Sequence, residues 1–183
     1  MTHVTYVGLL RGVNVGRSTR VAMADLRALV EQLGYRGVRT ILNSGNVVFA
    51  GPRASTARVA GQVELALARH LGVPVRVVVL TAPELANAAA ANPLVEMASD
   101  PSRLVVAVPS SPKDMVRMRP LLEKDWTPEA LAAGPRAAYF WCPGGFIDSP
   151  VAEAVRRAFG DSVTMRNWAT VGKLLTLSAK VRS

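Results

Sequence analysis

The sequence has very few of the side chains that build disulfides, metal sites and thiol or imidazole catalysis. Its 183 residues include one cysteine, Cys142, and two histidines, His3 and His70. A lone cysteine excludes an intramolecular disulfide and is typical of a reducing compartment. One cysteine and two distant histidines also fall short of the ligand set of a zinc site, so no metal site is predicted.

Long apolar runs are also missing, although 50% of the residues are apolar. No run of 18 apolar residues occurs, so neither a membrane-spanning helix nor a membrane partner is expected. The first residues, MTHVTYVGLLRGVNVG, have neither an early basic region nor a small-residue cleavage site, and they predict a first strand rather than a signal peptide. We therefore expect a cytoplasmic protein that is long enough to bury a substantial core.

Acidic residues and lysine are scarce beside arginine. The chain has 18 Arg and 4 Lys against 13 Asp and Glu, which gives a net charge of +9. Residues 1–92 hold ten Arg and four acids, whereas residues 93–183 hold twelve basic and nine acidic residues. Such a balance favours a polyanionic partner, although GC-rich coding also produces arginine-rich chains. No block of five like charges occurs, so no basic tail is predicted.

The first eighty residues predict the element order β-α-β-β-α-β. Their apolar spacing and turn signals indicate strands over Thr5–Val13, Val38–Leu42, Asn46–Phe49 and Pro74–Leu80, and helices over Ala24–Leu33 and Thr56–Leu71. Asn43, Ser44 and Gly45 form a turn signal between the two central strands, which therefore read as a hairpin. This order is that of a ferredoxin-like domain.

The second half repeats that order with little residue identity. It predicts strands over Arg103–Val108, around Leu131, over Ala137–Cys142 and over Ser162–Arg166, with helices opening at Ser111 and Ser149 and a final helix over Thr170–Val181. Pro120 is expected to kink or split the first of these helices. We therefore predict an α+β protein of two ferredoxin-like (βαββαβ-type) halves, 1–80 and 103–183, with antiparallel sheets and helices packed on them. Residues 81–102 form a connector helix and loop, and the second half is degenerate with an extra C-terminal helix.

Six motifs occur in order along the chain. They are LLRGVNVG, MADLRALVEQLGY, SGNVVF, ANPL, WCPGG and TMRNWATVGKL. Together they resemble the bacterial family labelled domain-of-unknown-function 1697, over about Tyr6 to Leu175. The resemblance implies a cytoplasmic α+β protein with ferredoxin-like halves, and it implies no established activity, substrate or catalytic residue. After Gly16 the chain reads RSTR, where relatives often have another glycine and a lysine, so a basic contact there would come from Arg17 or Arg20.

The opening motif LLRGVNVGR is a candidate anion site. A glycine loop after a strand can present backbone N–H groups to an anion, and Arg11, Asn14 and Arg17 would add charge and an amide donor. The two glycines are four residues apart, which fits neither a dinucleotide fingerprint nor a P-loop. The alternative is a connector in which the glycines permit positive φ angles.

The closing motif is the second candidate. Arg166 and Lys173 would hold phosphate, Trp168 would stack a base, and Asn167 or Thr170 would donate hydrogen bonds. The alternative is a helix capped by Asn167 or Thr170 with Trp168 packed in the core.

No catalytic constellation is recognisable, and neither a cofactor nor an oligomeric state is predicted. The leading hypothesis is a binding module for an anionic ligand, nucleotide or nucleic-acid phosphate, with the opening and closing motifs lining one cleft. The turn at Asn43 would add an amide if it faces the opening loop. The alternatives are an enzyme acting on a small phosphorylated or nucleotide-like substrate, and a structural or protein-interaction module. The candidate ligand-binding residues are Arg11, Asn14, Arg17, Asn43, Arg166, Asn167, Trp168, Thr170 and Lys173.

Overall fold

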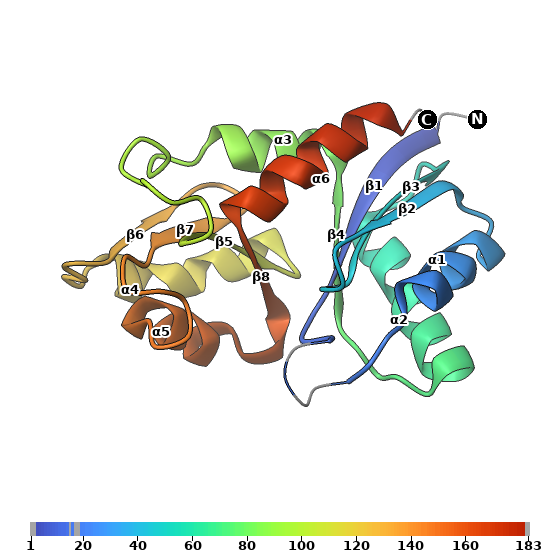
Figure 1. The fold of residues 1–183 in the computed structure, drawn as a ribbon, viewed down its shortest axis with the longest axis horizontal. Helices are drawn as coiled ribbons and strands as arrows, with labels where there is room; N and C mark the ends of the chain where they lie inside the picture. The colour runs from blue at the N-terminus through green and yellow to red at the C-terminus, as the bar shows by residue number, and fades with distance from the viewer. Residues whose placement is uncertain (1–2, 15, 17–18, 182–183) are drawn as a thin grey trace. The chain divides into compact units, whose positions relative to one another are not determined.

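A computed structural model describes residues 3–14, 16 and 19–181 of the chain (Figure 1). The chain divides into two compact units. Unit 1 comprises Met1–Leu85 and Lys173–Ser183, and unit 2 comprises Ala86–Gly172. The predicted halves follow element order, whereas these units follow spatial contacts, so residues 173–183 belong to the second half by order and to unit 1 by contact. Across the described residues, no helix is both long and apolar enough to cross a membrane.

Unit 1 has the predicted ferredoxin-like arrangement. Its elements are β1 (His3–Leu10), α1 (Met23–Gln32), β2 (Arg36–Ile41), β3 (Asn46–Pro52), α2 (Thr56–Leu71) and β4 (Val77–Thr81). The four strands form an antiparallel sheet in the order β2-β3-β1-β4. Two split β-α-β units interleave in this way because each helix returns the chain to a strand that is not a sheet neighbour of the strand before it.

The core of unit 1 lies between this sheet and its two helices. Apolar residues three or four apart on each helix, such as Leu26 and Val30 on α1, meet alternate residues of the strands. Tyr6 and Phe49 are fully buried, and their ring centroids lie 5.7 Å apart. The Tyr6 hydroxyl donates to the carbonyl of Pro52 at 3.0 Å and accepts from the backbone N–H of Ala54 at 2.8 Å. This buried ring therefore keeps its polar atom satisfied.

The first strand is shorter than predicted, because β1 ends at Leu10 rather than Val13. The backbone N–H of Arg11 still donates to the carbonyl of Arg76 at 2.9 Å, but the chain then turns away through Gly12 and Asn14, which have φ angles of 62° and 57°. Positive φ angles are incompatible with an extended strand, and this ends the pairing.

Unit 2 repeats the topology of unit 1. Helix α3 (Ala82–Ala90) crosses the boundary between the units. It is followed by β5 (Leu104–Pro109), the 3-10 helix η1 (Pro112–Met118), α4 (Arg119–Leu122), β6 (Ala130–Ala133), β7 (Ala138–Trp141), α5 (Pro150–Phe159), η2 (Gly160–Ser162), β8 (Val163–Asn167) and α6 (Trp168–Lys180). The second sheet has the order β6-β7-β5-β8, which corresponds strand for strand to that of unit 1. The α+β fold with two such halves and an extra C-terminal helix is therefore confirmed.

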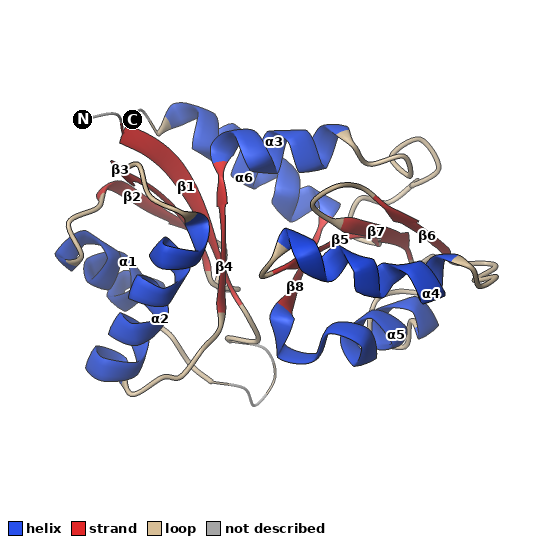
Figure 2. Cartoon of the chain, turned by 180° about the vertical axis from the view of Figure 1, so that it is seen from behind, coloured by secondary structure: helices blue, strands red, loops and turns tan. Residues whose placement is uncertain are grey.

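The helical side of unit 2 is less regular. Pro120 lies at the start of α4 and separates it from η1, so the predicted split is confirmed. Apolar residues of η1, α4 and α5 pack on the second sheet, around Phe140, Val155 and Phe159. Figure 2 shows α4 and α5 on the same side of this sheet.

The final helix begins two residues earlier than predicted, at Trp168 instead of Thr170. The Oδ1 atom of Asn167 accepts hydrogen bonds from the backbone N–H of Thr170 at 2.9 Å and from its hydroxyl at 2.7 Å. Asn167 is therefore the N-cap, because it satisfies an N–H group that the first turn of a helix leaves without a partner.

Candidate functional site

The opening loop is held by one side chain. The Nδ2 atom of Asn14 donates to the carbonyls of Val21 and Asn43, each at 2.7 Å, and its Oδ1 atom accepts from the backbone N–H of Val21 at 3.0 Å. Both amide hydrogens are thus directed at main-chain carbonyls. Asn14 ties the loop to the start of α1 and to the hairpin turn, and it holds a positive φ that asparagine tolerates better than most residues.

The hairpin turn does face the opening loop, as the sequence hypothesis required for a shared polar site. The backbone N–H of Leu10 donates to the carbonyl of Gly45 at 2.8 Å. A Cβ atom on Gly45 would lie 2.6 Å from both Leu10 and Val13, so the turn and the loop are in close contact. Asn43 is exposed, and the carbonyl that it presents to the loop is taken by Asn14.

The arginines of the opening loop have different positions. Arg11 is half-buried at the end of β1, and Arg17 lies outside the described residues. Arg20 is exposed and donates to the carbonyl of Gly16 at 3.0 Å. A ligand role for Arg11 and Arg17 stays a prediction.

The closing motif is organised around the start of α6. Arg166, on β8, is half-buried and donates from Nη1 to the Thr164 hydroxyl and the Met165 carbonyl, each at 2.8 Å. Burial lowers the pKa of its guanidinium to about 10, which leaves it charged at neutral pH. Trp168 is half-buried and Lys173 is exposed. Asn167 and Thr170 bond to each other as a helix cap, which is the capping alternative that the sequence left open.

The opening and closing motifs belong mostly to different units. Arg11, Asn14 and Asn43 are in unit 1 together with Lys173, whereas Arg166, Asn167, Trp168 and Thr170 are in unit 2. Within unit 1 the structure brings the opening loop and the hairpin turn together. The cleft shared by both motifs stays a prediction.

The net positive charge of the chain comes entirely from one unit. Unit 1 contains 13 Lys and Arg residues against four Asp and Glu, whereas unit 2 contains nine of each. Of the four acids in unit 1, Glu31 pairs with Arg27 at 4.0 Å and Glu64 with Arg76 at 3.4 Å. Glu84 accepts from the backbone N–H of Thr81 at 2.7 Å at the start of α3. Unit 1 thus has nine more cations than carboxylates.

Three of these cations belong to segments that lie together at one end of the first sheet. Arg36 begins β2 and pairs in register with Ala50, while Arg53 directly follows Pro52, the last residue of β3. Lys180 ends α6, and the carbonyl of the next residue, Val181, accepts a hydrogen bond from the Thr5 hydroxyl at 2.9 Å.

Two further contacts place these segments together. Pro52 pairs with His3 at the start of β1, and a Cβ atom on Gly37 would lie 3.3 Å from the side chain of Val181. Figure 1 accordingly shows the start of β1 beside the C-terminal end of α6. We call Arg36, Arg53 and Lys180 the basic end of unit 1. All three are exposed, and none forms an ion pair within the described part of the chain.

Sequence reasoning missed the basic end, because its residues lie 17 or more positions apart and belong to no motif. The available signal was the excess of arginine over acids in residues 1–92. To place these three residues together, one needs the register of β2 on β3 and the position of the end of α6. Neither can be derived from the spacing of apolar residues in the sequence.

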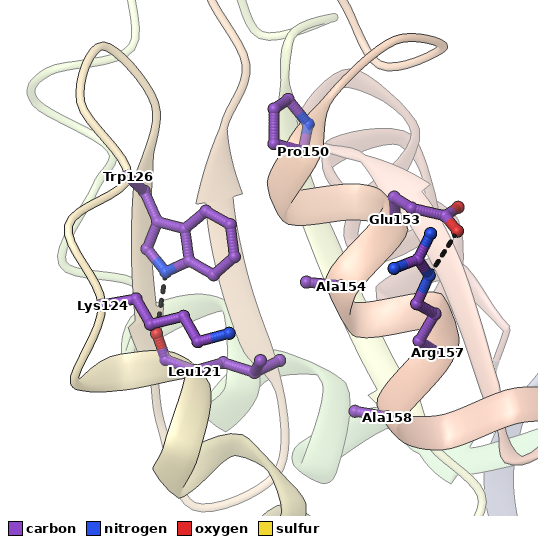
Figure 3. A pocket seen from close by; sticks show the side chains of 8 residues that line it. All are labelled: Leu121, Lys124, Trp126, Pro150, Glu153, Ala154, Arg157 and Ala158. Atoms are coloured by element: carbon purple, nitrogen blue, oxygen red, sulfur yellow. Dashed lines mark hydrogen bonds and ion pairs between the residues drawn. The ribbon is translucent and has the colours of Figure 1, made fainter.

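Unit 2 contains an open pocket of about 570 Å³ between α5 and a wall formed by α4 and the segment that follows it (Figure 3). One wall is formed by Leu121, Lys124 and Trp126, and the other by the α5 residues Pro150, Glu153, Ala154, Arg157 and Ala158. The Trp126 Nε1–H donates to the carbonyl of Leu121 at 2.7 Å, which fixes the indole on the first wall.

Charged side chains lie at the margin of this pocket. Glu153 pairs with Arg157 at 2.9 Å and with Arg156 at 3.2 Å, and these arginines hold the pKa of the Glu153 carboxyl below its ordinary value. The ammonium of Lys124 lies 5.8 Å from the centroid of the Trp126 ring.

The lone cysteine has a structural environment. Its thiol donates to the Ser149 hydroxyl at 3.2 Å, and that hydroxyl donates to Glu129 at 2.9 Å and accepts from the backbone N–H of Ala152 at 3.0 Å. Burial raises the pKa of the Cys142 thiol to about 11, so the nucleophilic thiolate is scarce at neutral pH. Within the described residues, His, Cys, Asp and Glu do not gather in a group of three that suits a metal ion.

Comparison with known proteins gives a family and a fold. The sequence profile of a family described as a protein of unknown function (DUF1697) matches residues 3–139. The solved structure of the conserved bacterial protein SP0830 from Streptococcus pneumoniae is similar, with a TM-score of 0.78 and 22% sequence identity. The match covers 97% of this chain and 99% of that one. No curated protein matches the chain.

Proposed function

Because the chain belongs to DUF1697, a family of proteins of unknown function, its activity has to be argued from its own residues, and we propose that it binds the phosphate backbone of a nucleic acid through the basic end of unit 1. The observation that carries this proposal is the charge distribution. Unit 1 holds the whole excess of positive charge, and Arg36, Arg53 and Lys180 lie on neighbouring segments at one end of its sheet, with no ion pair to a carboxylate among the residues that the structure describes.

Two arginines and a lysine suit phosphate contacts. A guanidinium donates two parallel hydrogen bonds to phosphate oxygens, and an ammonium acts as a compact point charge. The three cations come from three separate segments, which favours a strand with successive phosphates over a single phosphate group.

The aromatic residues of unit 1 do not favour base stacking at this end. Tyr6, Tyr35 and Phe49 are at most 8% exposed and pack against one another in the core. A protein surface without exposed aromatic side chains contacts the sugar-phosphate backbone of a nucleic acid rather than its bases. We therefore expect little dependence on sequence and a strong dependence on salt.

The experiment is a fluorescence-anisotropy titration of the full chain with labelled single-stranded RNA, single-stranded DNA and duplex DNA at low salt. The Arg36→Gln/Arg53→Gln double variant is compared with a control, Lys113→Gln/Arg119→Gln, which removes two exposed cations from unit 2. The proposal predicts binding that the first variant weakens and the control leaves unchanged. The proposal would be wrong if the chain does not bind nucleic acid at low salt, or if both double variants lose affinity to the same extent.

A further inference from the structure

We propose that the pocket of unit 2 binds a planar aromatic carboxylate, with its ring between Trp126 and α5 and its carboxylate on Lys124. This site lies outside the basic end and does not depend on nucleic-acid binding. Its volume of about 570 Å³ lies within the roughly 300–1,000 Å³ that is typical of small-molecule sites.

The α5 wall is flat because of its sequence. Pro150, Ala154 and Ala158 are four residues apart, so they lie one above another on one face of the helix. None of the three extends far from the backbone, and all line the pocket (Figure 3). A flat ring can therefore approach the helix closely.

The opposite wall presents the edge of an indole ring to the gap (Figure 3). The polar edge of Trp126 is occupied by its hydrogen bond to the Leu121 carbonyl, and that carbonyl also accepts from the backbone N–H of Lys124 at 3.3 Å. Trp126 itself packs partly against the core of unit 2. The outer edge of the indole is thus fixed beside the gap, where it can meet the face of a ligand ring edge-to-face, an arrangement that aromatic pairs favour.

The charges select a monoanion. Glu153 is already paired with two arginines, so it has little capacity for a ligand cation. Lys124 forms no ion pair within the described part of the chain, and it lines the same wall as Trp126. One unpaired cation beside an apolar gap suits a ring bearing a single carboxylate better than a polyphosphate.

The test is a calorimetric titration of the full chain with 2-naphthoate and with its neutral analogue, 2-naphthalenemethanol. We expect saturable one-to-one binding of 2-naphthoate, with the alcohol weaker by about tenfold because it cannot pair with the ammonium. Lys124→Gln should lower the affinity for 2-naphthoate to that for the alcohol and leave the affinity for the alcohol unchanged.

Ala158→Leu should abolish binding of both compounds by filling the gap. Ala86→Leu, at an exposed alanine of α3, is the matched control and should bind like the parent chain. Failure of 2-naphthoate to saturate, or unchanged binding in Lys124→Gln, would overturn the proposal. If circular dichroism shows that Ala158→Leu does not fold, the Lys124→Gln variant alone tests the proposal. This variant is expected to fold, because Lys124 is exposed. The Arg36→Gln/Arg53→Gln variant should retain 2-naphthoate binding, which separates this site from the basic end.

Discussion

The Nδ2 atom of Asn14 lies 2.7 Å from the main-chain carbonyl oxygen of Asn43, a residue 29 positions away. This hydrogen bond joins the opening glycine loop to the hairpin turn of unit 1. The same nitrogen also donates to the carbonyl of Val21. The asparagine of the opening motif LLRGVNVGR therefore has a structural role, because it connects the loop to two other segments of unit 1.

Asn14→Ala should destabilise the protein by about 1–3 kcal/mol, because three main-chain partners lose their bonds and alanine must adopt a positive φ. Asn14→Gly loses the same bonds but adopts that φ without strain, so it should be the less destabilised of the two variants. Urea unfolding measures both. A fully stable Asn14→Ala variant would show that the amide is not structural.

Asn167→Ala should lower the free energy of unfolding by about 0.5–2 kcal/mol through loss of the α6 cap. Asn167→Asp keeps an acceptor for the Thr170 N–H and should be close to the parent chain in stability. Thermal and urea unfolding give the comparison. Equal loss in both variants would indicate that the amide N–H₂ group, rather than the cap, is what matters.

Cys142 should make stability fall at high pH. The folded state holds the thiol proton, with a pKa of about 11, whereas the pKa of an ordinary thiol is 9.0. Between these values the folded state binds more protons than the unfolded state, so the free energy of unfolding decreases as pH rises from 9 towards 11.

The measurement is urea unfolding of the parent chain and of Cys142→Ala at several pH values in that range. Burial also raises the pKa of Tyr35 and Tyr139, which act in the same direction, so only the difference between the two proteins reports on the thiol. A difference that does not change with pH would contradict the assignment.

Local signals in the sequence predicted most of the fold. Pro120 lacks the N–H group that would continue η1, and the chain does change from η1 to α4 at Arg119, one residue before this proline. The Asn43–Gly45 turn joins β2 and β3 as expected, since Gly45 takes a φ of 73°. Several boundaries differ from the prediction, such as the start of β4 at Val77 instead of Pro74. At two of them, near Val13 and Thr170, the side chain of an asparagine accepts a hydrogen bond from the main chain where the chain turns.

The candidate sites were predicted less well, because polar residues serve both as ligands and as caps. Asn14 and Asn167 look like ligand donors in the sequence, and the structure shows that each completes main-chain hydrogen bonds. The basic end could not be predicted, because Arg36, Arg53 and Lys180 belong to no sequence motif. Only the strand register and the position of the end of α6 place their segments together. Trp126 and Ala158 likewise form one pocket only after unit 2 has folded.

The salt dependence of nucleic-acid binding tests the central claim most directly. Three phosphate contacts to a single strand give a slope of about −2 for log affinity against log salt, or about a 20-fold loss between 50 and 200 mM. The Arg36→Gln/Arg53→Gln variant retains one contact, so its slope should fall to about −0.7 and its loss to about threefold. An unchanged slope in that variant, or the same reduction in Lys113→Gln/Arg119→Gln, would contradict binding at the basic end.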